Sequence, residues 1–121
     1  MEKLSHQEEE AMQAVWKTGE GSVKLFLENM PEAGTPYTTL ASTIKNLEKK
    51  GFLSSRLIGN AYLYKPIVTE DEYKKKFMNG FVRDYFADSY KALVNFFIEE
   101  KKLSAGELKE LIDLIEKRKE K

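Results

Sequence analysis

The hydrophobic pattern of the chain changes its period at Gly51. Before this residue, apolar side chains recur at helical spacing in three short segments, and after it the runs 52–57 and 61–66 are strand-like. Ile58-Gly59-Asn60 between the runs suits a hairpin turn, and Pro66 is tolerated only at the end or the edge of a strand. Three helices followed by a hairpin predict a winged helix-turn-helix fold, in which the hairpin is the wing.

The first two helices are predicted from the residues at their ends. Ser5 and Glu8 have the spacing of a capping box, and Gly19 ends the apolar pattern that follows them. Ser22 can cap a second helix, which Pro31 stops because proline has no amide hydrogen for the helical ladder. The sequence therefore predicts two short helices joined by a glycine-containing turn.

The third helix is predicted to run from about residue 39 to residue 50. Thr38 or Thr39 can serve as its N-cap, and Gly51 can take the left-handed conformation just beyond its end. Its apolar residues are spaced i, i+4 and i+7, which places them on one side of the helix. They are Leu40, Ile44 and Leu47.

The opposite side of this helix carries hydroxyl, amide and ammonium groups, which are the groups that a reader of the DNA major groove needs. The wing brings further polar side chains beside the helix. The same pattern also occurs on ordinary amphipathic helices whose polar face is solvated, and this alternative stays open here. The residues expected to contact DNA are Thr38, Thr39, Ser42, Thr43, Lys45, Asn46, Lys49, Lys50, Arg56, Asn60 and Tyr62.

The distribution of charge supports the DNA-binding interpretation better than the total does. The net charge of the 121 residues is zero, whereas DNA-binding proteins usually carry an excess of basic residues. Residues 1–35 hold three Lys and Arg against seven Asp and Glu, and residues 67–121 hold twelve of each. Residues 36–66 hold five Lys and Arg against one Glu, so the positive block of the chain contains the third helix.

Composition excludes several classes of chemistry. The absence of cysteine rules out disulfides, thiolate metal sites and a cysteine nucleophile. His6 is the single histidine and lies in a capping position, so we expect no metal site and no cofactor. No nucleophile, base and orienting group form a set, so we expect no enzymatic activity. No apolar run approaches the length of about 20 residues that crosses a bilayer, and residues 1–5 lack the apolar stretch of a signal peptide. We therefore expect a soluble, cytoplasmic protein without membrane insertion.

Residues 69–121 are predicted to form a helical arm that makes a homodimer, following a DNA-binding domain of residues 1–68. The segment carries capping signals at Thr69, Ser89 and Ser104, and it holds eight of the thirteen Phe and Tyr residues. Three short helices bury little surface alone, so two interlocking arms are the economical arrangement; a helical subdomain that folds back on the wing is the alternative. The residues expected at the dimer interface are Phe77, Phe81, Val82, Tyr85, Phe86, Tyr90, Leu93, Val94, Phe97, Leu108, Leu111, Ile112 and Ile115.

Several segments, in the same order along nearly the whole chain, resemble the BlaI/MecI family of repressors of β-lactamase and methicillin-resistance genes. No single motif is decisive, but their combination is specific. The segments are Leu4-Ser5, Glu10, Met12, Val15-Trp16, Gly19, Tyr37-Thr-Thr-Leu40, Leu47-Glu-Lys-Lys-Gly51-Phe52, Tyr62-Leu-Tyr-Lys-Pro66, Leu93-Val-Asn-Phe96, Leu103-Ser104, Glu107 and Leu111.

The resemblance implies a mostly α-helical protein with a small β-hairpin, which binds a palindromic DNA operator as a homodimer and represses transcription. It also implies induction by a membrane-bound sensor protease and cleavage of an Asn-Phe bond, which matches Asn95-Phe96. The alternative for these two residues is that they are ordinary helix residues. Several relatives carry Arg or Lys where this chain has Ala41, so the operator sequence and the inducer are not transferable.

A winged helix also occurs in modules that bind protein rather than DNA, and the net neutrality of the chain keeps this second function open. In such a module, the basic helix face would dock on an acidic partner. A DNA reader should lose affinity for random duplex steeply as salt rises, and this dependence separates the two functions. A regulator that senses a small molecule is a third alternative, for which the sequence offers no separate ligand domain.

Overall fold

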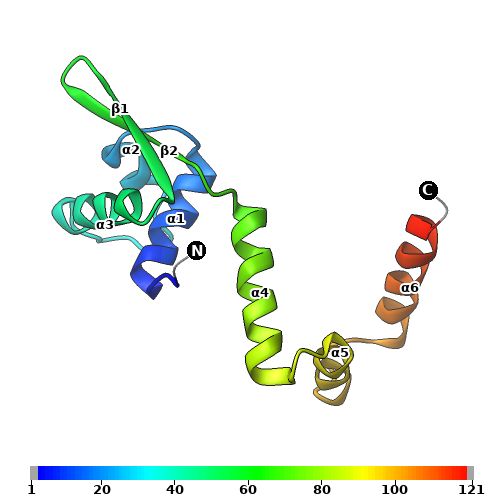
Figure 1. Ribbon diagram of the computed structural model, residues 1–121. Helices are drawn as coiled ribbons and strands as arrows, with labels where there is room; N and C mark the ends of the chain where they lie inside the picture. The colour runs from blue at the N-terminus through cyan, green and yellow to red at the C-terminus, as the bar shows by residue number, and fades with distance from the viewer. Residues whose placement is uncertain (1–2, 120–121) are drawn as a thin grey trace. The chain divides into compact units, whose positions relative to one another are not determined.

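The computed structural model describes residues 3–119, and the predicted mostly helical fold with a small hairpin is confirmed. The chain divides into two units, which we call unit 1, ending at Lys74, and unit 2, beginning at Lys75. Residues 1, 2, 120 and 121 of the two predicted domains lie outside the described residues. In chain order the elements are α1 (His6–Thr18), α2 (Val23–Glu28), α3 (Tyr37–Lys49), β1 (Leu53–Ile58), β2 (Ala61–Pro66), α4 (Glu70–Phe86), α5 (Tyr90–Glu99) and α6 (Ala105–Lys119) (Figure 1).

The caps of α1 and α2 form as predicted. The Ser5 hydroxyl oxygen accepts from the Glu8 amide at 3.2 Å, and a Glu8 carboxylate oxygen accepts from the Ser5 amide at 2.9 Å. Ser22 caps α2 by accepting from the Leu25 amide at 3.2 Å. Helix α2 ends at Glu28 rather than continuing to Pro31, because the Asn29 amide bonds to the Phe26 carbonyl three residues back instead of continuing the helical ladder.

Helix α3 begins earlier than the sequence predicted. Its N-cap is Pro36, with φ −65°, and no side chain caps it, so the prediction that Thr38 or Thr39 is the N-cap was wrong. Its C-terminal end matches the prediction: Gly51 has φ 83°. The Phe52 amide donates to the Leu47 carbonyl and the Gly51 amide donates to the Glu48 carbonyl, both at 3.0 Å, which is a Schellman motif.

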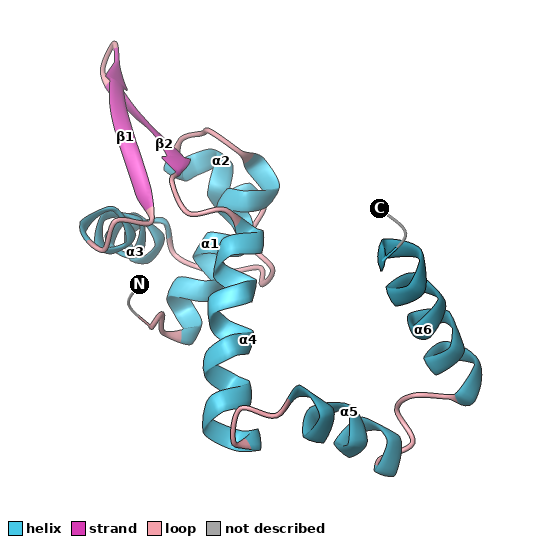
Figure 2. Ribbon diagram, turned by 45° about the vertical axis from the view of Figure 1, so that its right-hand side comes forward, coloured by secondary structure: helices cyan, strands magenta, loops and turns pink. Residues whose placement is uncertain are grey.

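The core of unit 1 lies between its three helices and the base of the hairpin. Each helix contributes one apolar face, and the two strands contribute their residues nearest the helices. Figures 1 and 2 show α1, α2 and α3 grouped together, with the far end of the β1–β2 hairpin extending beyond them. The buried residues include Ala11, Met12, Val15, Phe26, Leu40, Ile44, Leu47, Phe52, Leu53 and Tyr64.

The hairpin has the predicted two-stranded, antiparallel form and is attached to the loop between α1 and α2. Ile58 pairs with Ala61, so the turn has two residues, and the first of them, Gly59, has φ 61°. This positive φ suits glycine at the first position of a tight hairpin turn. Gly21 and Tyr64 exchange backbone hydrogen bonds of 2.9 and 2.8 Å, which adds a bridge to β2. The base of the hairpin is therefore held by backbone pairing as well as by packing.

The first turn of α4 belongs to unit 1, which places the unit boundary six residues later than the predicted domain boundary at residue 68. The Tyr73 hydroxyl donates to a Glu9 carboxylate oxygen at 2.6 Å, and its ring centroid lies 5.7 Å from that of Trp16. The Trp16 indole N–H donates to the Val68 carbonyl at 2.9 Å. Burial, together with the Glu9 carboxylate, raises the pKa of the Tyr73 phenol above its ordinary value.

Unit 2 buries few of its apolar side chains. Among residues 75–119, Val82 and Leu93 are buried, so these two of the predicted interface residues pack within a single chain. The Phe81 ring contacts the rings of Phe77, Tyr85 and Phe86, with the shortest centroid distance, 5.1 Å, to Tyr85. Large apolar residues that stay exposed in unit 2 are Phe77, Met78, Tyr85, Tyr90, Val94, Phe96, Phe97, Ile98, Leu111, Ile112, Leu114 and Ile115.

Helix α5 ends in a left-handed residue that is not glycine. The Lys102 amide donates to the Phe97 carbonyl at 2.8 Å, the Lys101 amide donates to the Ile98 carbonyl at 3.0 Å, and Lys101 has φ 59°. Lys101→Gly should raise the free energy of unfolding by about 0.5–1 kcal/mol, because glycine carries no Cβ penalty there. Chemical unfolding at fixed protein concentration measures the change. Lys102→Gly is the control and should lower stability, since Lys102 has a negative φ; equal effects of the two variants would contradict the prediction.

Candidate nucleic-acid interface

Helix α3 has one face in the core and one face in solvent, as its periodicity predicted. Leu40, Ile44 and Leu47 are buried, which fixes the rotation of the helix about its own axis. The opposite side is built from short hydroxyl and amide groups and from two lysines, and it is exposed along the length of the helix. These exposed residues are Thr38, Ser42, Lys45, Asn46 and Lys49.

Thr43 is buried, unlike the other predicted DNA contacts on α3. It keeps 7% of its surface exposed, and its hydroxyl donates to the Thr39 carbonyl at 2.9 Å. This hydrogen bond satisfies the hydroxyl within the helix, so the side chain packs and is not available to a ligand. We therefore remove Thr43 from the proposed contact set, while Thr39 stays in it as a half-buried residue.

Lys50 is held in an ion pair with the first turn of α1. Its ammonium lies 2.8 Å from a Glu8 carboxylate oxygen, and the two side chains are 26% and 9% exposed. Burial alone would raise the pKa of Glu8, but the hydrogen bonds from Lys50 and Ser5 outweigh it and lower the pKa below its ordinary value. Lys50 thus joins the end of α3 to the start of α1, and a contact with DNA would require it to leave this partner.

We expect Lys50→Ala to destabilise the protein by about 1–3 kcal/mol, because it leaves a largely buried carboxylate without its cation. The lowered pKa of Glu8 means that the pair contributes stability fully above pH 4.5, its ordinary value, and that this contribution is lost as the pH falls below it. Denaturant unfolding from pH 7 to pH 3 should therefore show a smaller loss on acidification in the variant than in the original chain. Lys49→Ala is the exposed control, and an equal effect there would contradict the assignment.

Side-chain hydrogen bonds join the wing to α3 and to the loop between α1 and α2. The Ser55 hydroxyl donates to the Glu48 carboxylate, which ties β1 to the last turn of α3. The Arg56 guanidinium makes a two-pronged contact with the Glu20 carboxylate, with Nε to Oε2 at 3.0 Å and Nη2 to Oε1 at 2.7 Å. Asn60, in the turn, is exposed. The first contact joins the wing to α3, the second joins it to the loop between α1 and α2, and neither involves the tip of the wing.

Tyr62 is exposed on β2, and its ring lies 6.5 Å from that of Tyr64. Tyr64 is buried, and this burial, with the nearby Glu48 carboxylate as a smaller cause, raises the pKa of its phenol. The two tyrosines thus differ: Tyr64 belongs to the core and Tyr62 offers its ring to solvent. This exposure keeps Tyr62 among the proposed contacts.

Sequence reasoning missed three residues of this surface. Tyr37 is 53% exposed in the first turn of α3, and it was missed because the helix starts two residues earlier than expected. Lys65 is exposed on β2 and has no ion-pair partner among the described residues, although its place in the positive block was a usable signal. Glu20 is 36 residues from Arg56, and no local pattern in the sequence announces their pairing.

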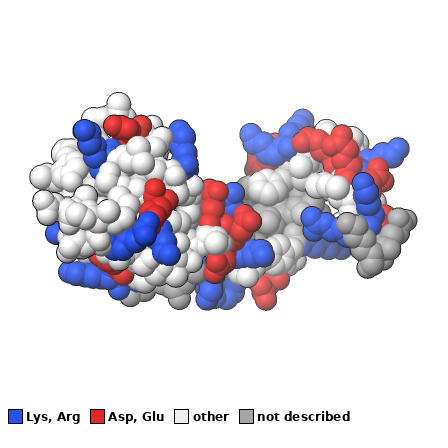
Figure 3. Space-filling view, turned by 90° about the horizontal axis from the view of Figure 1, so that it is seen from above, with Lys and Arg blue, Asp and Glu red and all other residues white. Residues whose placement is uncertain are grey.

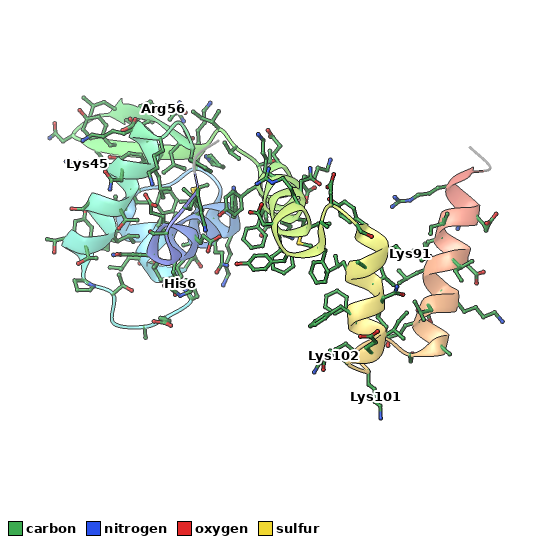
Figure 4. The ribbon with its side chains drawn as sticks, turned by 60° about the horizontal axis from the view of Figure 1, so that its bottom comes forward. His6, Lys45, Arg56, Lys91, Lys101 and Lys102 are labelled. Carbon is green, nitrogen blue, oxygen red and sulfur yellow. The ribbon has the colours of Figure 1, made fainter. Side chains whose placement is uncertain are left out.

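Charges of both signs lie on the face of the molecule that Figure 3 shows. In the face that Figure 3 shows, basic and acidic side chains alternate over the surface instead of forming one positive field. Figure 4 shows Lys45 on α3 and Arg56 on the wing, at a distance from His6 on α1.

His6 is 83% exposed and lies 3.5 Å from a Glu10 carboxylate oxygen. In the part of the chain that the structure describes, no three His, Asp or Glu side chains gather as a metal site would require.

Across residues 3–119, none of the helices combines the length and the apolar character of a membrane span.

Comparisons with known proteins agree with this geometry. The sequence profile described as "Penicillinase repressor" matches residues 4–117. The methicillin resistance regulatory protein MecI of Staphylococcus aureus strain N315 is 27% identical over 118 residues, which are 96% of this chain and 95% of that protein. The penicillinase repressor of Bacillus licheniformis is 25% identical over 118 residues, covering 97% of this chain and 92% of that protein. The solution structure of the DNA-binding domain of the repressor BlaI has a TM-score of 0.51 and 25% identity, and it covers 60% of this chain and 94% of that one.

Proposed function

The chain belongs to the penicillinase repressor family, a family of DNA-binding transcriptional repressors rather than enzymes, and on this premise we propose that it binds a palindromic operator as a homodimer. The observation that carries the proposal is the exposed polar face of α3, held in place by the buried face opposite it. When it is bound to its operator, the protein would block transcription from the promoter that overlaps this operator. Because its target is DNA, the proposal places the protein in the cytoplasm.

The exposed residues of α3 and of the wing, which we call the reading surface, are assigned to different DNA groups by the chemistry of their side chains. Lys45 and Lys49 are exposed cations without an ion-pair partner among the described residues, so we assign them to phosphate oxygens. Asn46 and Ser42 have the amide and hydroxyl groups that read base edges in the major groove. Asn60 at the tip of the wing reaches the flanking backbone or minor groove in this proposal. The phosphate contacts set affinity, and the base contacts set sequence preference.

The homodimer is supported by the apolar surface of unit 2. Helices α5 and α6 expose Val94, Phe97, Ile112 and Ile115 along with other large apolar residues, although a folded protein gains stability by burying such side chains. A second copy of the same surface buries them with a two-fold axis, which also presents two reading helices to a palindrome. Operator half-sites should then lie roughly 10 base pairs apart, centre to centre, or a multiple of that.

Salt-dependent binding of the intact protein tests the function. Fluorescence anisotropy with a random duplex, and with a palindromic duplex selected by the protein from a random pool, should give log–log salt slopes of several units. Sedimentation at the same concentrations should give the mass of a dimer. Binding that does not change with salt, or no binding to any duplex, would remove the repressor function and leave the protein-interaction module as the remaining candidate.

We also propose that cleavage at Asn95-Phe96 by a membrane-bound sensor protease releases the repressor from DNA. Both residues are exposed, but they lie within α5, and the Phe96 carbonyl accepts a helical hydrogen bond from the Glu100 amide at 3.0 Å. A protease that needs extended backbone would therefore act on a locally opened α5. A chain ending at Asn95 should be monomeric and bind the palindrome weakly. Mass spectrometry of the protein from induced cells should find this fragment, and cuts elsewhere would contradict the site.

A further inference from the structure

The five cations of residues 36–66 are not equivalent in the folded protein. Lys45, Lys49 and Lys65 are exposed and have no ion-pair partner in the region that the structure describes. Lys50 and Arg56 are each paired with a glutamate that lies outside this segment. The surface that faces DNA in the proposed function therefore has fewer available positive charges than the sequence suggests.

The two ion pairs differ in what they do for the fold. The pair of Lys50 is largely buried and joins two helices. In the pair of Arg56 with Glu20, the side chains are 61% and 32% exposed. An ion pair this open to solvent contributes little to stability, because water and salt screen it. Stability therefore does not explain why Glu20 holds Arg56.

The geometry of the second pair is well defined despite its exposure. The backbone of Gly21 pairs with Tyr64 on β2, which fixes the position of Glu20 beside that strand. Arg56 lies on β1 opposite Leu63, so its side chain reaches across β2 to the carboxylate. The contact uses Nε and Nη2, the same edge of the guanidinium that binds a phosphate with two parallel hydrogen bonds. Glu20 therefore occupies one of the edges through which Arg56 could bind a DNA phosphate.

We propose that Glu20 is a specificity-determining residue that acts through Arg56. By occupying the guanidinium, it withdraws the charge of Arg56 from the sequence-independent attraction to DNA, so that binding depends more on contacts made by α3. The inference rests on the proposed function. The affinity for random DNA grows with the number of phosphates that a protein neutralises. The additional affinity for an operator comes from base contacts, which do not depend on the number of neutralised phosphates. Neutralising Arg56 therefore widens the ratio between operator affinity and random-duplex affinity.

The test compares Glu20→Gln with the original chain on random duplex and on the palindrome selected by that chain. Freeing Arg56 should raise random-duplex affinity by on the order of 3- to 10-fold near 0.1 M salt and steepen its log–log salt slope by about one unit. The ratio of palindrome to random-duplex affinity should fall. The thermal unfolding midpoint should stay close to that of the original chain, because the pair is exposed.

Two controls separate this role from a general change in charge. Glu28→Gln makes the same change in net charge at an exposed acid of α2 and should leave the slope and the ratio nearly unaltered. In an Arg56→Gln background, Glu20→Gln should lose most of its effect. An equal gain from Glu28→Gln, an undiminished gain without Arg56, or weaker DNA binding by Glu20→Gln would each overturn the inference. Absence of salt-sensitive binding by the original chain would overturn the proposed function as well, whereas the other results leave that function intact.

Discussion

Phe97→Asp should convert the proposed dimer into monomers and lower affinity for a palindromic operator by on the order of 10²- to 10⁴-fold, because each DNA-binding unit then binds its half-site without the avidity of its partner. Phe97 is exposed on α5 in a single chain, so an aspartate there is tolerated in the monomer. In the dimer, the same carboxylate would be buried without a cation. Sedimentation velocity and anisotropy on the selected palindrome measure the two effects.

Asn95→Asp is the matched control for this prediction. It introduces the same side chain in the same helix, on the side away from the row formed by Leu93, Val94 and Phe97. It should leave the mass of the dimer and its operator affinity nearly unchanged. Persisting dimers of Phe97→Asp would instead favour the arm that packs within its own chain, and monomers of Asn95→Asp would show that any charge on α5 disrupts assembly.

Removing the two free lysines of α3 is the second change with a large expected effect. The double variant Lys45→Ala, Lys49→Ala should weaken binding of random duplex and palindrome alike by on the order of 10- to 100-fold near 0.1 M salt, and should flatten the salt slope by about two units. The effect is shared by both duplexes because phosphate contacts carry no sequence information. Titrations at four or more salt concentrations measure the slope.

Lys91→Ala with Lys109→Ala is the charge-matched control, since both lysines are exposed in unit 2 and have no ion-pair partner among the described residues. This variant should keep the original slope and remain dimeric. If its slope falls as far as that of the α3 variant, binding depends on net charge alone, and α3 is not the reading surface.

Much of unit 1 was predictable because its signals are local. The Ser5 and Glu8 capping box, the left-handed Gly51 and the turn at Gly59 each depend on residues within a few positions of one another. The start of α3 was less accessible: Thr38 and Thr39 are good capping residues, but Pro36 already has the backbone angles that begin the helix. Local propensity therefore placed the helix correctly and its first turn too late.

The candidate site was less predictable than the fold because its electrostatics depend on distant partners. Glu8 is 42 residues from Lys50 and Glu20 is 36 residues from Arg56, so the positive block in the sequence overstates the free charge on the surface. The burial of Thr43, by contrast, was accessible from spacing. It lies three residues after Leu40 and four before Leu47, on the border of the apolar stripe. It was nevertheless predicted as a DNA contact because it carries a hydroxyl group.

The contact between Trp16 and Tyr73 gives the protein an internal optical reporter. Trp16 is the single tryptophan of the chain, and its indole is held by the Val68 carbonyl and by the Tyr73 ring. Unit 2 contains only phenylalanine and tyrosine as aromatic residues. When the indole is excited selectively, its fluorescence therefore reports the unfolding of unit 1 and the release of the first turn of α4. The aromatic residues of unit 2 do not contribute to this signal.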